Sequence, residues 1–266
     1  IEDPDRHRGA QCSVATVNEA LGGFRPGVIV LSGETGEGKS TVATFLCWDL
    51  ARLGHGVMVT SFENKPIGTV QKLLRMELRG DFTTMEKEDR RQGLQRISGY
   101  ELWILNHYGQ ITPAKLVETI AYAKRRNGIT FFMIDHLGFA IDPDVDEVSA
   151  IKSLMRSLAL IAYQLDVVVF LVAHVKNVPR KGGAIQRPTK FDLKGSSAIR
   201  QDAADIIMVE KLGMTKAHPY PRSCWHFDKV RSEFGRPGAA VTLAFDPDAT
   251  IFAANLADTP MGADFM

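Results

Sequence analysis

The segment that most constrains the fold of this chain is a glycine-rich octet between a short apolar run and an amphipathic stretch. The apolar run, Val28 to Leu31, predicts a buried strand, and the amphipathic stretch, Lys39 to Leu53, predicts a helix that ends at Gly54. The octet matches the pattern G-x-x-x-x-G-K-[ST], because it reads Gly33-Glu34-Thr35-Gly36-Glu37-Gly38-Lys39-Ser40. A strand, this octet and a helix in succession predict a phosphate-binding turn, the P-loop.

The residue types of the octet suit a triphosphate. Its three glycines let backbone N–H groups turn toward the phosphates, and the helix that follows adds partial positive charge at its N-terminus. Lys39 is expected to reach the β- and γ-phosphates and Ser40 to bind Mg²⁺, with nucleotide contacts along the whole octet and at Thr41. The alternative is a glycine-rich turn that matches by chance. A P-loop alone indicates an NTPase or a kinase.

The rest of the chain predicts one α/β fold class. Hydrophobic residues make up 45% of the 266 residues, enough for a sizeable core. Short apolar runs alternate with amphipathic stretches, which predicts a mostly parallel central sheet flanked by helices. Further parallel strands are expected at 57–62, 102–105, 130–134, 167–173 and 206–209, helices at 66–79, 84–97, 112–127, 149–165 and 196–204, and an antiparallel pair near the C-terminus at 224–230 and 241–245.

Polar side chains stand where three of these strands end. Phe131-Phe132-Met133-Ile134-Asp135 is an apolar strand ending in an acid, which predicts that Asp135 holds Mg²⁺; a simple Asp turn is the alternative. Glu63 ends the strand after the P-loop helix, where a carboxylate can orient and deprotonate water; a solvated loop acid is the alternative. His174 ends the apolar strand from Val168 to Ala173. It is a candidate contact of the γ-phosphate, and a structural histidine is the alternative.

A basic, acid-free loop follows His174. The net charge of the chain is only +1, so any nucleic-acid contact must come from a local patch. The stretch 175–190 supplies one, and without hydrophobic periodicity it predicts a mobile loop.

Five segments together resemble the RecA-fold hexameric replicative DNA helicases. The similarity is greatest to the phage-type primase-helicases and the mitochondrial replicative helicase, and more distant to the bacterial DnaB type. It runs from about Val17 to Phe245. The segments are GETGEGKS, SFE at 61–63, FFMID at 131–135, LVAHVKN at 171–177 and DLKGSSAIRQDAAD at 192–205, and the last two are the most specific.

This resemblance implies roles for individual residues. Glu63 resembles the catalytic base of the family and His174 its γ-phosphate sensor. The loop after His174 resembles the one that grips single-stranded DNA in the central channel. The DNA contacts implied are Lys176, Asn177, Arg180 and Lys181 in the loop and Lys194, Gly195 and Ser196 beyond it.

Two residues near the C-terminus resemble a pair that acts across subunits. Lys229 and Arg231 resemble the K-x-R pair, whose arginine reaches the nucleotide of a neighbouring subunit; a surface ion pair is the alternative for Arg231. Phe245, late in a strand, is a candidate for stacking on the nucleotide base, and a plain core aromatic is at least as good an interpretation.

The resemblance also implies an activity and its partners. The expected activity is NTP-driven translocation on single-stranded DNA with unwinding, using ATP or another NTP or dNTP with Mg²⁺. The expected assembly is a homo-oligomer, a hexameric ring, with primase and polymerase as further partners. Ser40 stands in place of the more usual Thr, and no well-matched linker helix precedes Val17. The alternatives are a recombinase or repair ATPase, a protein-directed switch ATPase and a small-molecule kinase.

Domain limits and compartment complete these expectations. Residues 1–16 are expected to be a tail or linker remnant, 17–257 the ATPase domain and 258–266 a flexible tail. Because the chain starts at Ile1 with a charged stretch, a fragment lacking an N-terminal domain is one interpretation. Three cysteines without paired short spacings argue against disulfides or a zinc site, and no run is long enough to span a membrane. A reducing compartment is expected: cytoplasm or nucleoid, a phage host or the mitochondrial matrix.

Overall fold

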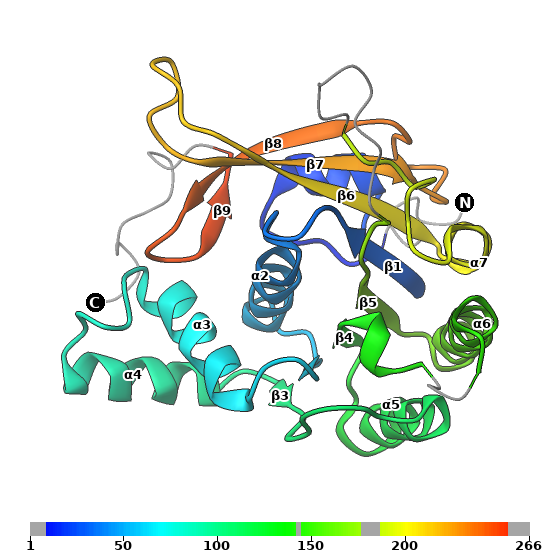
Figure 1. Cartoon of the computed structure of the whole chain (residues 1–266). Helices are drawn as coiled ribbons and strands as arrows, with labels where there is room; N and C mark the ends of the chain where they lie inside the picture. Colours follow the sequence, from blue (N-terminus) through cyan, green and yellow to red (C-terminus); the bar gives the residue numbers. More distant parts are fainter. Residues whose placement is uncertain (1–8, 142–144, 177–186, 255–266) are drawn as a thin grey trace, which may run out of the picture.

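The computed structural model describes residues 9–141, 145–176 and 187–254. In these residues nine strands form one sheet in the order β3-β2-β4-β5-β1-β6-β7-β8-β9 (Figure 1). The strands are β1 Gly27–Ser32, β2 Val57–Ser61, β3 Leu102–Ile104, β4 Phe131–Asp135, β5 Val168–Val172, β6 Asp205–Leu212, β7 Arg222–Lys229, β8 Ala240–Asp246 and β9 Ile251–Ala253. The predicted α/β fold class is confirmed.

Six strands, from β3 to β6 in the sheet order, run parallel. Every residue of β2, β4 and β5 is buried, as expected of strands covered on both faces. All six therefore end on the same side of the sheet, here called the carboxyl edge, and begin on the other, the amino edge. The P-loop follows β1 at the carboxyl edge.

The last three strands reverse direction. β7 pairs antiparallel to β6, β8 to β7 and β9 to β8. The predicted antiparallel pair is confirmed, while β9 was not anticipated because three residues give too short a pattern to read. This reversal carries the end of β7 to the amino edge, opposite Ile206 at the start of β6.

Helices cover both faces of the sheet and enclose two cores (Figure 1). One face is covered by α1 Ala15–Leu21 and α2 Lys39–Arg52; α3 Pro66–Leu78 packs beside α2, and α4 Lys87–Ser98 packs against α3. The other is covered by α5 Pro113–Asn127, α6 Glu147–Leu165 and α7 Ser196–Asp202, and a 3-10 helix, η2, spans Leu137–Phe139.

Local sequence explains both ends of α5 and the start of α4. Thr112 caps α5 by accepting from the backbone N of Lys115, Pro113 occupies the first position, and Gly128 ends the helix with φ 70°. The helix predicted from Thr84 begins instead at Lys87. Asp81 explains the difference, since its carboxylate and carbonyl bind Thr83 and Thr84 and hold them in a turn.

The N-terminal part of the described chain packs into the fold. Ala10 bridges Phe24, Cys12 and Val14 are buried, and α1 starts at Ala15. The domain limits expected at 17 and 257 stay predictions, and the tail 258–266 lies outside the described residues. In the described part, no helix is both long and apolar enough to cross a membrane.

Candidate nucleotide and DNA site

The P-loop adopts the turn that its glycines predict. Gly36 and Gly38 have φ 89° and 87°, a region that L side chains rarely adopt, and Gly38 leads into α2. A Cβ on Gly33 would lie 2.4 Å from the carbonyl oxygen of Val209 in β6. Lys39 is buried, and its Nζ donates to the carbonyl of Glu34 at 2.7 Å, across the loop.

Two predicted Mg²⁺ ligands meet beneath this loop. Ser40 Oγ donates to Asp135 Oδ1 at 3.1 Å, so the start of α2 and the end of β4 share one point. Both side chains offer hard oxygen ligands, which Mg²⁺ prefers, so these residues fit that ion. Lys72 of α3 lies close enough to act on the charge of Asp135; it was missed because nothing in its helix pattern marks it.

A third carboxylate stands at the same edge, beside an unpredicted histidine. Glu63 follows β2 with 56% of its side chain exposed, and its Oε2 lies 4.0 Å from His136 Nε2. The His136 ring lies 4.4 Å from that of His174 in an edge-to-face arrangement. His136 thus stands between two predicted site residues. Its place directly after a strand-end Asp was the available signal.

One hydrogen bond fixes the orientation of the His136 ring. Its Nδ1 accepts from the backbone N of Gly138 at 3.0 Å, since a backbone N–H can only donate. In the neutral ring the proton is therefore on Nε2, which faces Glu63.

Burial shifts the titration of the groups at this edge. Burial, and then the charges of His136 and Lys39, lower the pKa of His174. Burial also lowers the pKa of His136, opposed by Glu63. Burial raises the pKa of Asp135, opposed by the Ser40 hydrogen bond and Lys72. Both imidazoles are thereby held neutral near pH 7.

The base of the predicted DNA loop is attached to His174. Val175 bridges Leu193, Lys176 N donates to Asp192 O, and Lys194 N donates to His174 O. Lys176 is exposed, and Lys194 is half exposed in an ion pair with Glu147 at 2.6 Å. Asn177, Arg180 and Lys181 lie outside the described residues.

An open cavity of about 500 Å³ adjoins this base. It is lined by both histidines and both lysines just described, together with Glu147. Gly195 follows Lys194 in the chain, buried with φ 72° at the start of α7, and Ser196 is the first residue of that helix.

The K-x-R pair lies at the other edge of the sheet. Lys229 Nζ donates to the carbonyls of Arg200 and Ala203 at 2.6 and 2.5 Å. Arg231 is exposed; its backbone N donates to Asp205 Oδ1 and its Nη2 to Gln201 O. Asp205 is level with Ile29 of β1, roughly 10 Å along the sheet from Ser32 at about 3.3 Å per residue. The pair is thus remote from the P-loop of its own chain.

Phe245 packs against the core. Its ring lies 4.8 Å from that of Phe252, and its backbone N donates to Pro221 O. This is the packing expected of a core aromatic, and stacking on a base stays a prediction.

Comparison with known proteins decides the family. Residues 9–254 match the DnaB-like helicase C-terminal domain. The chain belongs to the DnaB-like helicase family. This is the branch to which the sequence resemblance was more distant, and it confirms a RecA-fold replicative helicase motor domain. No curated protein matches the chain.

Two solved structures share the fold. One, described as an ATPase domain, has 20% identity and a TM-score of 0.79, with 92% of this chain and 91% of that chain covered. A DnaB-like replicative helicase, described with its interactions with primase, has the same identity and TM-score. The match covers 92% of this chain but 63% of that helicase.

Proposed function

We propose that this chain hydrolyses ATP, or another NTP, at the carboxyl edge and uses the energy to move along single-stranded DNA and unwind duplex. The observation that carries the proposal is the contact of Ser40 with Asp135 beneath the P-loop, with Glu63 at the same edge. The residues proposed to bind phosphate, to bind the metal and to activate water therefore lie close together.

Each of these residues has a distinct task. The P-loop amides and Lys39 hold the triphosphate, which requires Lys39 to leave the Glu34 carbonyl. Ser40 and Asp135 would hold Mg²⁺, which when bound neutralises charge that develops on the phosphates. Glu63 orients the attacking water and accepts its proton.

His136 is proposed as the positioning residue of Glu63. Its Nε2–H faces the carboxylate at 4.0 Å, within reach of a hydrogen bond after a small movement. An exposed glutamate has many rotamers, so a donor on one side narrows its directions toward the water.

The DNA loop is proposed to respond to the γ-phosphate through His174. Its imidazole faces the site, and its carbonyl accepts from Lys194, so a shift of His174 moves the base of the loop. Lys176 and Lys194 are the described cations that would contact DNA phosphates, and Arg180 and Lys181 extend the same basic stretch.

Assembly follows from the separation of the two edges. Arg231 is proposed to reach the nucleotide of a neighbouring copy, which a closed ring such as a hexamer provides. A primase partner is proposed from the family, along with function in a reducing compartment that contains the replicating DNA.

The decisive experiment compares ATP turnover with and without single-stranded DNA, followed by strand displacement on a forked duplex. Lys39→Ala and Glu63→Gln should each reduce turnover by about 10²-fold or more, and Glu63→Gln should still bind nucleotide. Glu118→Gln is the matched control, an exposed acid paired with Lys115 on α5. ATP turnover that DNA does not stimulate would favour a switch ATPase, and stimulation without strand displacement would favour the recombinase type.

A further inference from the structure

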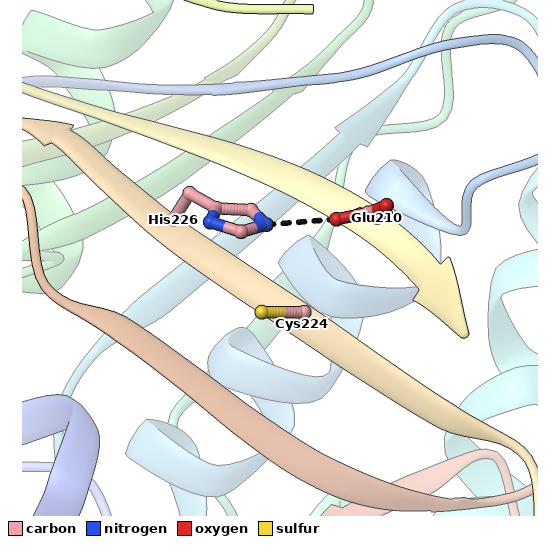
Figure 2. Close-up of side chains that lie close together, drawn as sticks. All are labelled: Glu210, Cys224 and His226. Atoms are coloured by element: carbon pink, nitrogen blue, oxygen red, sulfur yellow. Dashed lines mark hydrogen bonds and ion pairs between the residues drawn. The ribbon is translucent and has the colours of Figure 1, made fainter. Parts of the chain in front are cut away.

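Three metal-ligating side chains lie together on β6 and β7, outside the nucleotide site (Figure 2). Glu210 of β6 is directly opposite Cys224 of β7, and His226 is two residues further along β7. Side chains alternate along a strand, so all three are on one face of the antiparallel pair. Their nearest ligand atoms lie within 4.8 Å of one another.

The arrangement gives a set of three donors with one open side. Cys224 is buried, while the side chains of His226 and Glu210 are 19% and 39% exposed. A thiolate, an imidazole and a carboxylate are the ligands that Zn²⁺ takes, and three protein ligands leave a fourth position for solvent. The sequence argument against a zinc site rested on the absence of paired cysteines. A ligand set of one cysteine, one histidine and one glutamate has no such spacing.

We propose that Glu210, Cys224 and His226 form a binding site for a divalent ion of the Zn²⁺ class. The two negative charges of the deprotonated thiol and the carboxylate balance the ion. His226 Nε2 now lies 2.9 Å from Glu210 Oε2. A nitrogen and an oxygen bound to the same tetrahedral Zn²⁺ lie about 3.4 Å apart. The ion can therefore replace the shared proton after these two atoms move apart by a few tenths of an ångström. The Cys224 thiolate then completes the set by a small side-chain movement.

This site adjoins the phosphate loop. β6 contacts the P-loop at Gly33, against the Val209 carbonyl, and at Glu37, whose carboxylate accepts from the backbone N of Lys211. An ion that joins β6 to β7 at Glu210 therefore fixes the strand on which the P-loop rests. The ligands of this site also differ from those of the proposed Mg²⁺ site, because Ser40 and Asp135 offer only oxygen.

Cobalt provides the test, because a Co²⁺–thiolate bond absorbs light and a Co²⁺–oxygen site lacks that band. We expect the full chain, without nucleotide or Mg²⁺, to show a saturable sulfur-to-cobalt absorption at one ion per chain. One equivalent of Zn²⁺ should abolish the band, whereas millimolar Mg²⁺ should leave it. Zn²⁺ should also raise the melting temperature.

Variants assign the signal to the cluster. Cys224→Ser should remove the band, and Cys47→Ala, a buried thiol of α2 outside the cluster, should retain it. Glu210→Gln keeps a hydrogen-bonding partner for His226 and should weaken cobalt binding at least 10-fold, which keeps the test decisive if Cys224→Ser fails to fold. Absence of the band in the wild-type chain, or full affinity in Glu210→Gln, would reduce the cluster to a cross-strand hydrogen-bonded pair beside a core thiol.

Discussion

The two edges of the sheet both carry charged side chains, but their partners differ. At the carboxyl edge, Asp135, Ser40, His136 and His174 lie in one continuous set of side chains, with Glu63 facing His136. At the amino edge, the side chains of Lys229 and Arg231 bind backbone carbonyls of α7 or the residue after it. The carboxyl edge holds the groups proposed for the reaction, whereas the cations of the amino edge lie away from the P-loop of their own chain. In the proposed ring, a second copy would supply what each edge lacks.

The helix α7 joins the two edges. Lys194, just before it, donates its backbone N–H to His174, and the carbonyls at its other end accept from Lys229 and Arg231. Cations at a helix C-terminus are also favoured by its dipole. The pair is therefore held by the helix that starts beside the proposed γ-phosphate sensor, and a displacement of α7 moves both ends.

The largest effect is expected from Arg231→Ala. If the guanidinium stabilises the transition state in a neighbouring site, its loss should lower ATP turnover by about 10³-fold with folding unchanged. Mixing this variant with Lys39→Ala should restore part of the activity, because some interfaces then combine an intact Arg231 with an intact P-loop. Turnover rates of each variant alone and of the mixture measure this.

Arg236→Ala is the matched control for that prediction. It removes an exposed arginine of the same region, paired with Glu19 at 3.6 Å, and should leave turnover unchanged. If Arg231→Ala matches this control, the amino edge has no part in catalysis and the surface interpretation of Arg231 stands.

A smaller effect is expected at the carboxyl edge from His136. His136→Phe keeps the ring but removes the donor that faces Glu63, and should lower kcat about 10- to 100-fold with KM nearly constant. His136→Gln places an N–H near the former Nε2 and should recover most of the rate. Equal losses in both variants, or a loss confined to KM, would contradict a positioning role.

The sequence predicted the carboxyl edge better than the amino edge for a physical reason. The P-loop, Asp135, Glu63 and His174 each stand directly after an apolar run, and parallel strands bring such ends together. Pattern and position therefore suffice to place them at one edge. His136 directly follows Asp135 but was not predicted, because its proposed role depends on ring orientation, which the Gly138 N–H sets and no periodicity encodes.

Elsewhere the sequence could not reveal what depends on pairing register. The antiparallel strands were predicted, but the pairing of Glu210 with Cys224 follows only from the register, which includes a shift between Ile206 and Ile207. The contacts of Lys229 with α7 likewise depend on how β7 is placed against that helix. β9 was too short to predict from its apolar residues.

A moderate loss of stability is expected from Gly195→Ala, which changes the residue that precedes α7. Gly195 has φ 72°, and a Cβ there would lie 2.8 Å from Ile151 of α6. The backbone strain should cost about 1–2 kcal/mol of unfolding free energy, and the contact with Ile151 should add to it. Gly54→Ala is the control, since Gly54 has φ 87° with nothing within 4 Å of its Cβ position. Urea unfolding that shows equal losses would assign the whole effect to backbone strain.

The smallest effect is expected from the pH dependence of stability at the carboxyl edge. Burial and nearby cations lower the pKa of His174 in the folded chain, whereas an unfolded histidine has a pKa of about 6.5. The folded state therefore binds fewer protons just below that pH. His174 therefore contributes to the free energy of unfolding. This contribution is complete above about pH 6.5 and is lost as the pH falls through the pKa of the unfolded state toward that of the folded state.

His174→Asn should therefore reduce the fall in melting temperature between about pH 7.5 and 5.5, measured without nucleotide or Mg²⁺. His136, Lys39, Glu63 and Asp135 face the same group and remain in the variant, so the fall should shrink but persist. His218→Asn, at an exposed turn between β6 and β7, should leave the fall unchanged. Folding partly buries His174 but leaves His218 exposed. An equal reduction in both variants would therefore show that the effect arises in the unfolded chain.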